Sequence, residues 1–273
     1  MGIDLRSHTH PLVFAHRGDS KNYPENTLLS MDSAVQVGAD VLETDFCLTK
    51  DNQLVLSHDL RVDRLSGVEG YIRDFTLEEL QQLDAGYNYT LDGKHYPFRD
   101  QGISIPSARE LFENFPQMQF NIDLKIPDQI AVTNLLTLVE EFDLESQILV
   151  GSFHADQITR IRKLSPNIAT GGTFTEARNF VLIAKLYLNH WLPNYPQFHA
   201  LQLPPSYRGL KIATPRVIDA LHRRGCALHI WTINDPVHQL QLIRLGIDGI
   251  FTDDPAGLRS LLEHRQDLNP QIN

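Results

Sequence analysis

Cysteine is scarce in this sequence, which contains only Cys47 and Cys226 among its 273 residues. Two cysteines cannot form the disulfide framework that stabilises many small secreted proteins. The chain also lacks an apolar run of membrane-spanning length, and its first ten residues contain no apolar core like that of a signal peptide. We therefore expect a cytoplasmic protein without stable membrane insertion.

Basic residues are also few, with 24 Lys and Arg against 34 Asp and Glu and a net charge of -10. This balance argues against a broad nucleic-acid-binding surface, because phosphate backbones require basic patches. An anionic substrate must therefore be bound locally, by a metal ion and a few cationic side chains. The length suits one globular domain covering residues 1–273, and the sequence does not indicate an oligomeric state.

Short apolar segments alternate with stretches of helical pattern along the chain. The predicted strands are Leu12–Ala15, Val41–Phe46, Gln119–Lys125, Ile148–Ser152, Ile168–Thr173, Ala200–Leu203, Ala227–Ile233 and Gly249–Thr252. The predicted helices begin near Asn26, Ser107, Pro127, Ala155, Thr175, Thr214, Pro236 and Pro255. Such alternation favours an α/β fold of the TIM (β/α)8 barrel type. An open doubly wound sheet is the alternative, although no Gly-x-Gly-x-x-Gly motif follows the first strand.

One segment departs from this alternation. The connector between the second strand and the apolar run Leu54–Leu56 is too short for a parallel crossover, so these segments must form a β-hairpin. A two-residue turn at Asp51-Asn52 would place Asp45 opposite His58. The hairpin should therefore bring His58 beside the carboxylates of the second strand.

An insertion at about residues 60–105 follows this hairpin and fits no barrel element. It contains several glycines and aromatic residues and one short helical segment, Leu77–Leu83. One interpretation is a satellite subdomain that packs its own aromatic side chains. The other is a lid or wall around the alcohol group of a substrate.

Two histidines are the candidate catalytic residues. His16 closes the first strand, at the end of a barrel where active sites lie, and His58 follows the hairpin. Histidine titrates near neutral pH, so two of them can share acid and base duties. Arg17 follows His16 and carries a planar fork suited to phosphate, and Gly18 permits close approach of the backbone to a ligand.

Three carboxylates lie on alternate positions of two predicted strands. Glu43 and Asp45 share one face of the second strand, and Asp123 shares a face of the third with Lys125. Oxygen ligands without thiolates or clustered imidazoles favour Mg²⁺ or Ca²⁺ over zinc. Lys125 is a candidate cation for phosphate oxygens, although a purely structural Asp123–Lys125 pair is the alternative. Together these residues suggest metal-assisted phosphate ester chemistry.

Further fragments complete a pattern that extends over almost the full chain. Trp231, in one of them, is a candidate substrate-contacting residue, although it could equally belong to the core. As a set, the fragments resemble the glycerophosphodiester phosphodiesterase family. They are Ala15-His16-Arg17-Gly18, Pro24-Glu25-Asn26-Thr27, Glu43-Thr44-Asp45, His58-Asp59, Asn121-Ile122-Asp123-Leu124-Lys125, Ser152-Phe153, Trp231-Thr232-Ile233-Asn234 and Asp248-Gly249-Ile250-Phe251-Thr252-Asp253.

The resemblance implies metal-dependent hydrolysis of glycerophosphodiesters, such as glycerophosphocholine or glycerophosphoethanolamine, to sn-glycerol 3-phosphate and an alcohol. It implies His16 and His58 as the acid–base pair and Glu43 and Asp45 as metal ligands, in a TIM-type barrel with an insertion. The third ligand of the family is usually glutamate, and this position is the shorter Asp123. Lysophospholipase D-type cleavage of lysophospholipids and a non-catalytic phosphodiester-binding barrel are the alternatives.

Overall fold

Eight parallel strands form a closed barrel in the computed structural model, which describes residues 3, 5–6, 10–188, 191 and 196–268. They are β1 (Leu12–His16), β2 (Val41–Leu48), β4 (Gln119–Leu124), β5 (Ile148–Gly151), β6 (Ala169–Thr170), β7 (Ala200–Leu203), β10 (Ala227–Ile230) and β11 (Gly249–Thr252). Their order around the sheet is β6-β5-β4-β2-β1-β11-β10-β7. A parallel bridge between Gly171 and Ala200 joins the two ends. The predicted TIM-type barrel is therefore confirmed, and the open sheet is excluded.

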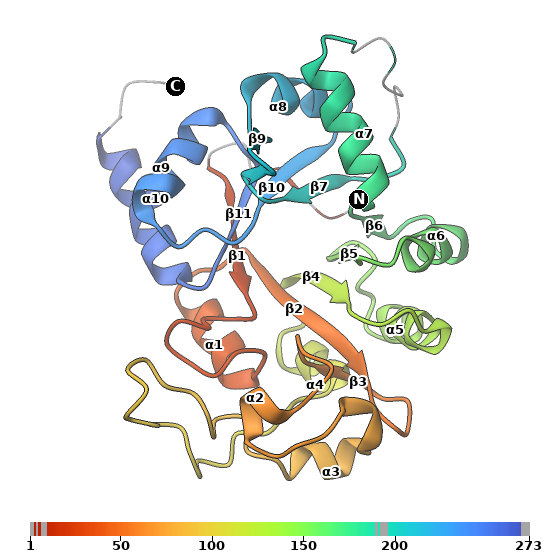
Figure 1. Cartoon of the computed structure of the whole chain (residues 1–273), viewed down its shortest axis with the longest axis vertical. Coiled ribbons are helices and arrows are strands. Elements are labelled where there is room, and N and C mark those ends of the chain that lie inside the picture. The colour runs from red at the N-terminus through yellow and green to blue at the C-terminus, as the bar shows by residue number, and fades with distance from the viewer. Residues whose placement is uncertain (1–2, 4, 7–9, 189–190, 192–195, 269–273) are drawn as a thin grey trace.

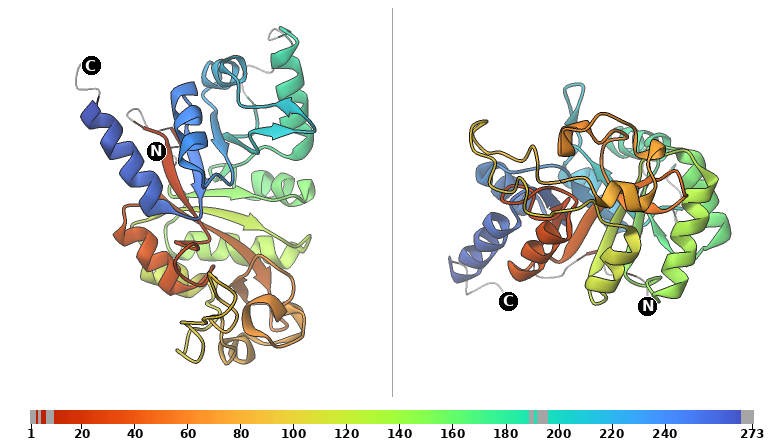
Figure 2. Two further views of the ribbon diagram at one scale, coloured as in Figure 1. Left: turned by 60° about the vertical axis from the view of Figure 1, so that its left-hand side comes forward. Right: turned by 90° about the horizontal axis from the view of Figure 1, so that it is seen from below.

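Helices follow these strands and surround the barrel (Figures 1 and 2). They are α1 (Leu28–Gln36), α4 (Ala108–Asn114), α5 (Gln129–Glu141), α6 (Ala155–Leu164), α7 (Phe174–Lys185), α8 (Pro215–His222), α9 (Pro236–Leu245) and α10 (Pro255–Leu268). Apolar side chains of strands and helices form one main core between the two layers. Such burial supplies most of the stability of helices of this length.

Side-chain caps fix where several helices begin. Thr214 and Asp235 cap α8 and α9 ahead of a proline, as their sequence predicts. The helix predicted near Thr175 is capped by Thr173, and the Glu176 carboxylate accepts hydrogen bonds from the Thr173 backbone N–H and hydroxyl. This reciprocal capping box begins the helix at Phe174.

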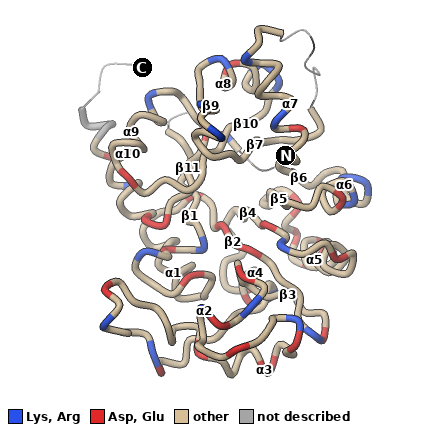
Figure 3. The backbone as a smooth tube through the Cα atoms, in the orientation of Figure 1, with Lys and Arg blue, Asp and Glu red and all other residues tan. Residues whose placement is uncertain are grey.

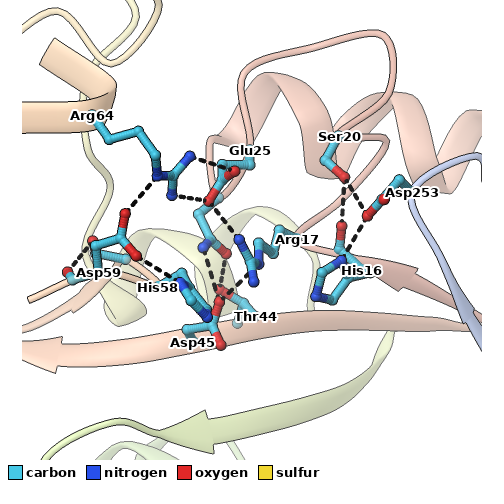
Figure 4. A network of polar contacts seen from close by, with 12 residues as sticks. His16, Arg17, Ser20, Glu25, Thr44, Asp45, His58, Asp59, Arg64 and Asp253 are labelled. Carbon is cyan, nitrogen blue, oxygen red and sulfur yellow. Dashed lines mark hydrogen bonds and ion pairs between the residues drawn. The ribbon is translucent and has the colours of Figure 1, made fainter. Parts of the chain in front are cut away.

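The hairpin of β2 and β3 (Leu54–Leu56) pairs one residue away from the predicted register. Phe46 lies opposite Leu56, and the Ser57 N–H donates to the Asp45 carbonyl at 2.9 Å. Asp45 is therefore opposite Ser57 rather than His58. His58 lies just beyond the strand, so its ring still lies beside Asp45 (Figure 4).

The turn of this hairpin explains the shift. The Thr49 N–H donates to the Gln53 carbonyl at 2.9 Å, which leaves three residues in the loop instead of two. Asn52, the last of them, has a φ of 62°. A three-residue loop with its final residue in the left-handed region is a common alternative to the two-residue turn.

This conformation makes Asn52 a test of the hairpin. Asn52→Ala should lower the free energy of unfolding by about 1 kcal/mol, because a Cβ without a compensating polar group is unfavourable at positive φ. Asn52→Gly should leave it nearly unchanged. Urea unfolding of both variants measures the difference, and an alanine variant as stable as the glycine variant would contradict the assigned turn.

Residues 60–105 fold beside the hairpin rather than into the barrel (Figures 1 and 2). They contain α2 (Asp63–Ser66), the 3₁₀ turn η1 (Ile72–Asp74) and α3 (Leu77–Gln81). A separate apolar cluster, which includes Cys47 and Val55 of the hairpin and Ile72 and Leu80 of the insertion, packs these elements together. The hairpin therefore anchors the insertion at one end of the barrel.

Within the described residues, no helix is long and apolar enough to cross a membrane. Figure 3 shows basic and acidic segments interspersed along the chain, including the region where β1, β2 and β4 meet. The expectations of a cytoplasmic location and of no nucleic-acid partner stay predictions.

Candidate active site

The predicted catalytic and metal-binding residues lie together at the carboxyl ends of β1, β2 and β4. His16 is level with Glu43 in the parallel register, and Asp45 is level with Asp123. His58 enters from the hairpin at the same end (Figure 4). In barrels of this type the carboxyl ends of the strands form the active face.

A carboxylate directly after the last barrel strand, β11, orients His16. The Asp253 Oδ1 lies 2.6 Å from His16 Nδ1, and the Ser20 hydroxyl donates to the same oxygen at 3.1 Å. The Asn234 amide donates to Asp253 Oδ2 at 2.6 Å and fixes the carboxylate in turn. Burial opposes the charged imidazole, but Glu43 and Asp253 raise the pKa of His16 above its ordinary value.

Replacement of this carboxylate by an amide should weaken His16. Asp253→Asn should lower kcat. The loss should not exceed the roughly 10²–10⁴-fold that removal of a general acid or base itself costs. The pKa of His16 should fall, because the variant no longer places a negative charge beside the imidazolium. Kinetics and NMR titration of the His16 ring measure both effects. An unchanged pKa would show that Asp253 does not act on His16.

His58 has a carboxylate partner of its own. Its Nδ1 lies 2.7 Å from Asp59 Oδ1, and Arg64 Nε donates to Asp59 Oδ2 at 2.5 Å. Each histidine thus presents Nδ1 to a carboxylate and keeps Nε2 for another partner. That arrangement fixes the ring orientation and the tautomer of a catalytic histidine.

Arg17 lies between the two histidines in a strained conformation, with a φ of 59°. Its Nη1 donates to Glu25 Oε1 at 3.0 Å, and its Nε is 3.3 Å from Asp45 Oδ2. This buried Nε–H nevertheless makes no hydrogen bond to the described residues. Arg17 therefore has a buried hydrogen-bond donor at the centre of the site that lacks an acceptor among the described residues.

Gly18 supports this turn for a reason that differs from the predicted one. It has a φ of 83°, and a Cβ there would lie 2.5 Å from Ser30 Oγ. Glycine is required because the loop after β1 packs tightly on the start of α1. The structure shows this close approach to α1, and close approach of the backbone to a ligand stays a prediction.

Lys125 joins two of the three predicted metal ligands. Its Nζ lies 2.8 Å from Asp45 Oδ1 and 2.6 Å from Asp123 Oδ2. Burial disfavours the charge on Asp45, but Lys125 and Arg17 hold the pKa of Asp45 below its usual range. Burial raises the pKa of Asp123 in spite of Lys125. The structure therefore contains the Asp123–Lys125 pair that was one interpretation of these residues.

Glu43 is buried with a single backbone donor, the Arg17 N–H at 3.0 Å from Oε2. Burial and the neighbouring Asp45 raise the pKa of Glu43 to about 7. Additional positive charge would favour its ionised form, so the oxygen donors here fit a hard divalent cation chemically. With Lys125 between two of the carboxylates, however, no three metal-ligating side chains in the described ranges are positioned to hold an ion at once. Metal binding by Glu43, Asp45 and Asp123 stays a prediction.

A cavity of about 640 Å³ opens beside His16 and Arg17. The insertion supplies part of its wall, including Leu65, Ala85, Tyr89 and Leu91. The Tyr89 hydroxyl donates to the Lys21 carbonyl at 2.6 Å and ties this wall to the loop after β1. The insertion therefore packs its own apolar core and also lines a cavity at the site. That it surrounds the alcohol group of a substrate stays a prediction.

Comparison with known proteins decides the family. Residues 16–257 match the model of the Glycerophosphoryl diester phosphodiesterase family. The chain belongs to this family. A glycerophosphodiester phosphodiesterase of Caldanaerobacter subterraneus subsp. tengcongensis is 32% identical over 256 residues, which cover 92% of this chain and 97% of the relative. A human lysophospholipase D is 27% identical over 276 residues, covering 92% of this chain and 85% of the relative.

Solved structures agree with this assignment. An Oleispira antarctica phosphodiesterase in complex with the product sn-glycerol-3-phosphate is 26% identical, with a TM-score of 0.73 and coverage of 93% and 97% of the two chains. A glycerophosphoryl diester phosphodiesterase domain from Mycobacterium tuberculosis shares the fold, with a TM-score of 0.82 at 20% identity and coverage of 92% and 98%. This member of the glycerophosphoryl diester phosphodiesterase family is therefore an enzyme that hydrolyses glycerophosphodiesters, as its sequence predicts, and a non-catalytic barrel is not supported.

Thr27 caps α1, and the Asn26 side chain bonds Asp45 at 3.2 Å and Thr44 at 2.7 Å. Trp231 is half-buried and packs against the cluster that contains Phe14. Its role as a substrate contact stays a prediction.

Other residues of the site were not identified as functional from the sequence. They are Glu25, Asp59, Arg64, Asn234 and Asp253. All except Arg64 lie in the fragments that carry the family resemblance, so that resemblance was the available signal. Arg64 lies in the insertion outside every fragment, and only its contacts reveal it.

Proposed function

We propose that this enzyme cleaves glycerophosphodiesters by acid–base catalysis between His16 and His58, with the phosphate held by Arg17 and Lys125. The observation that carries the proposal is the pair of histidines, each oriented by a carboxylate, at one end of the barrel. Two cations, Arg17 and Lys125, and three carboxylates lie at the same end of the barrel. Glu43, Asp45 and Asp123 would hold a divalent cation, Mg²⁺ or Ca²⁺, which would neutralise phosphoryl oxygens when bound.

The phosphate would bind beside the two cations, which the Asp45 carboxylate joins in the structure. Arg17 can donate its unused Nε–H to a phosphate oxygen, and its Nη1 stays fixed on Glu25. Lys125, which directly follows β4, contributes an ammonium group. Burial and the carboxylates of Asp45 and Asp123 keep this group in place. Donors fixed before the reaction stabilise the charge that develops on the phosphoryl oxygens.

The alcohol group would occupy the cavity beside His16. Because His16 lines this cavity, we assign it as the acid that protonates the leaving alkoxide. The raised pKa of His16 suits this role, since the ring stays protonated to a higher pH. His58 would then remove the proton from the attacking oxygen. Products would be sn-glycerol 3-phosphate and the free alcohol.

A substrate panel tests this function. Glycerophosphocholine and glycerophosphoethanolamine should be hydrolysed faster, by kcat/KM, than lysophosphatidylcholine. The similarity to a human lysophospholipase D makes cleavage of lysophospholipids the alternative. A preference for lysophosphatidylcholine would favour that alternative, and no turnover of any diester with Mg²⁺ or Ca²⁺ present would contradict the proposal.

A further inference from the structure

The Arg64 guanidinium, from the insertion, contacts the carboxylate partner of Arg17 and that of His58. Arg64 Nη1 and Nη2 donate to the two oxygens of Glu25 at 2.9 and 2.7 Å, and Arg64 Nε donates to Asp59 at 2.5 Å. Asp59 in turn holds His58, and Glu25 holds Arg17 (Figure 4). Two independent carboxylates therefore meet on a single side chain.

The insertion holds Arg64 in this position. Arg64 belongs to α2, whose next residue, Leu65, is buried. The Asn88 N–H donates to the Leu65 carbonyl at 3.1 Å, and the Asn88 amide donates to the Asp63 carbonyl at 3.2 Å. The backbone of α2 is thus tied to the segment that walls the cavity. The position of the insertion therefore determines the position of the Arg64 guanidinium.

Stability alone does not account for these contacts. The Arg64 side chain is 48% exposed and Asp59 33% exposed, whereas Glu25 is 17% exposed. The exposed Arg64–Asp59 pair contributes little to folding, typically below about 1 kcal/mol. A planar fork that binds two carboxylates instead fixes their orientation, which a flexible ammonium would do less well.

We propose that Arg64 is a positioning residue that sets the geometry of His58 through Asp59 and of Arg17 through Glu25. Docking of the insertion would thus complete a barrel site whose histidines, metal-site carboxylates and phosphate-binding cations lie outside it. This inference rests on the proposed roles of His58 and Arg17. A shift of a catalytic group by about 1 Å can cost about 10²-fold in rate.

Kinetics of Arg64 variants test the inference. Arg64→Ala should lower kcat/KM for glycerophosphocholine by about 10–10²-fold. Misplacement of His58 should lower kcat, and misplacement of Arg17 should raise KM. Arg64→Lys should restore part of the activity, because an ammonium can satisfy one carboxylate but lacks the fork. Arg61→Ala is the matched control: Arg61 also lies in the insertion and pairs with Asp63, but it contacts neither carboxylate. It should keep wild-type kinetics.

Double-mutant cycles separate the two connections. In an Asp59→Asn background, Arg64→Ala should change mainly KM, and in a Glu25→Gln background mainly kcat. Full additivity in both backgrounds would overturn the inference. A loss of activity in Arg64→Ala would also overturn it if it followed a fall in melting temperature that Arg61→Ala shares. So would a loss whose size changes with the alcohol group of the substrate, because that would indicate direct substrate contact by Arg64.

The outcome also separates this inference from the proposed function. If His58→Ala loses turnover while Arg64→Ala does not, only the positioning role fails. If His58→Ala keeps turnover, the proposed function fails first, and the Arg64 inference fails with it.

Discussion

Replacing His16 or His58 by alanine should lower kcat by about 10²–10⁴-fold, the contribution of a general acid or base. Melting temperature should change little, since the two side chains are 18% and 37% exposed and neither belongs to the apolar core. The double variant should lose less than the product of the single losses, because the two residues act as a unit. Near-native turnover in either variant would remove that histidine from the mechanism.

The leaving group distinguishes the two roles. A glycerol phosphodiester of p-nitrophenol has a leaving group that needs no protonation, so it should restore much of the activity of His16→Ala. It should not restore His58→Ala, which would still lack the base. The opposite pattern would exchange the acid and base assignments. Activity lost only through unfolding would instead show that the histidine is structural.

Removal of divalent metal should abolish turnover, and Mg²⁺ or Ca²⁺ should restore it. Three carboxylates meet only two cationic side chains here, and the pKa of Glu43 is raised to about 7 by burial and by Asp45. A bound cation would offset this charge and neutralise the phosphoryl oxygens. Activity is measured after treatment with EDTA and again after titration with each metal. Full activity of the metal-free enzyme would contradict a catalytic cation.

A matched pair of variants identifies the ligands. Glu43→Gln should raise the metal concentration needed for half-maximal activity, because the variant loses a charged oxygen. Glu141→Gln removes a carboxylate that pairs with Arg109 on the surface, and it should leave the metal titration unchanged. Equal metal dependence in the two variants would show that Glu43 does not bind the ion.

Much of the fold could be predicted because its signals are local. Apolar residues recur at strand or helix spacing, and Thr214-Pro215 and Asp235-Pro236 mark helix starts. Both signals depend on neighbouring residues only. The short connector before Leu54 required a hairpin on grounds of chain length. Its register was predicted one residue out, because the positive φ of Asn52 selects a three-residue loop that composition does not reveal.

The sequence by itself determined the set of chemical groups: two histidines, three carboxylates and two cations at the ends of predicted strands. Only the tertiary structure decided their partners. Asp253 reaches His16 across 237 residues, and Arg64 reaches Glu25 across 39. Parallel pairing of β1 with β11 makes the first contact possible, and docking of the insertion makes the second. Such pairings depend on how distant segments pack, and no periodicity along the chain encodes them.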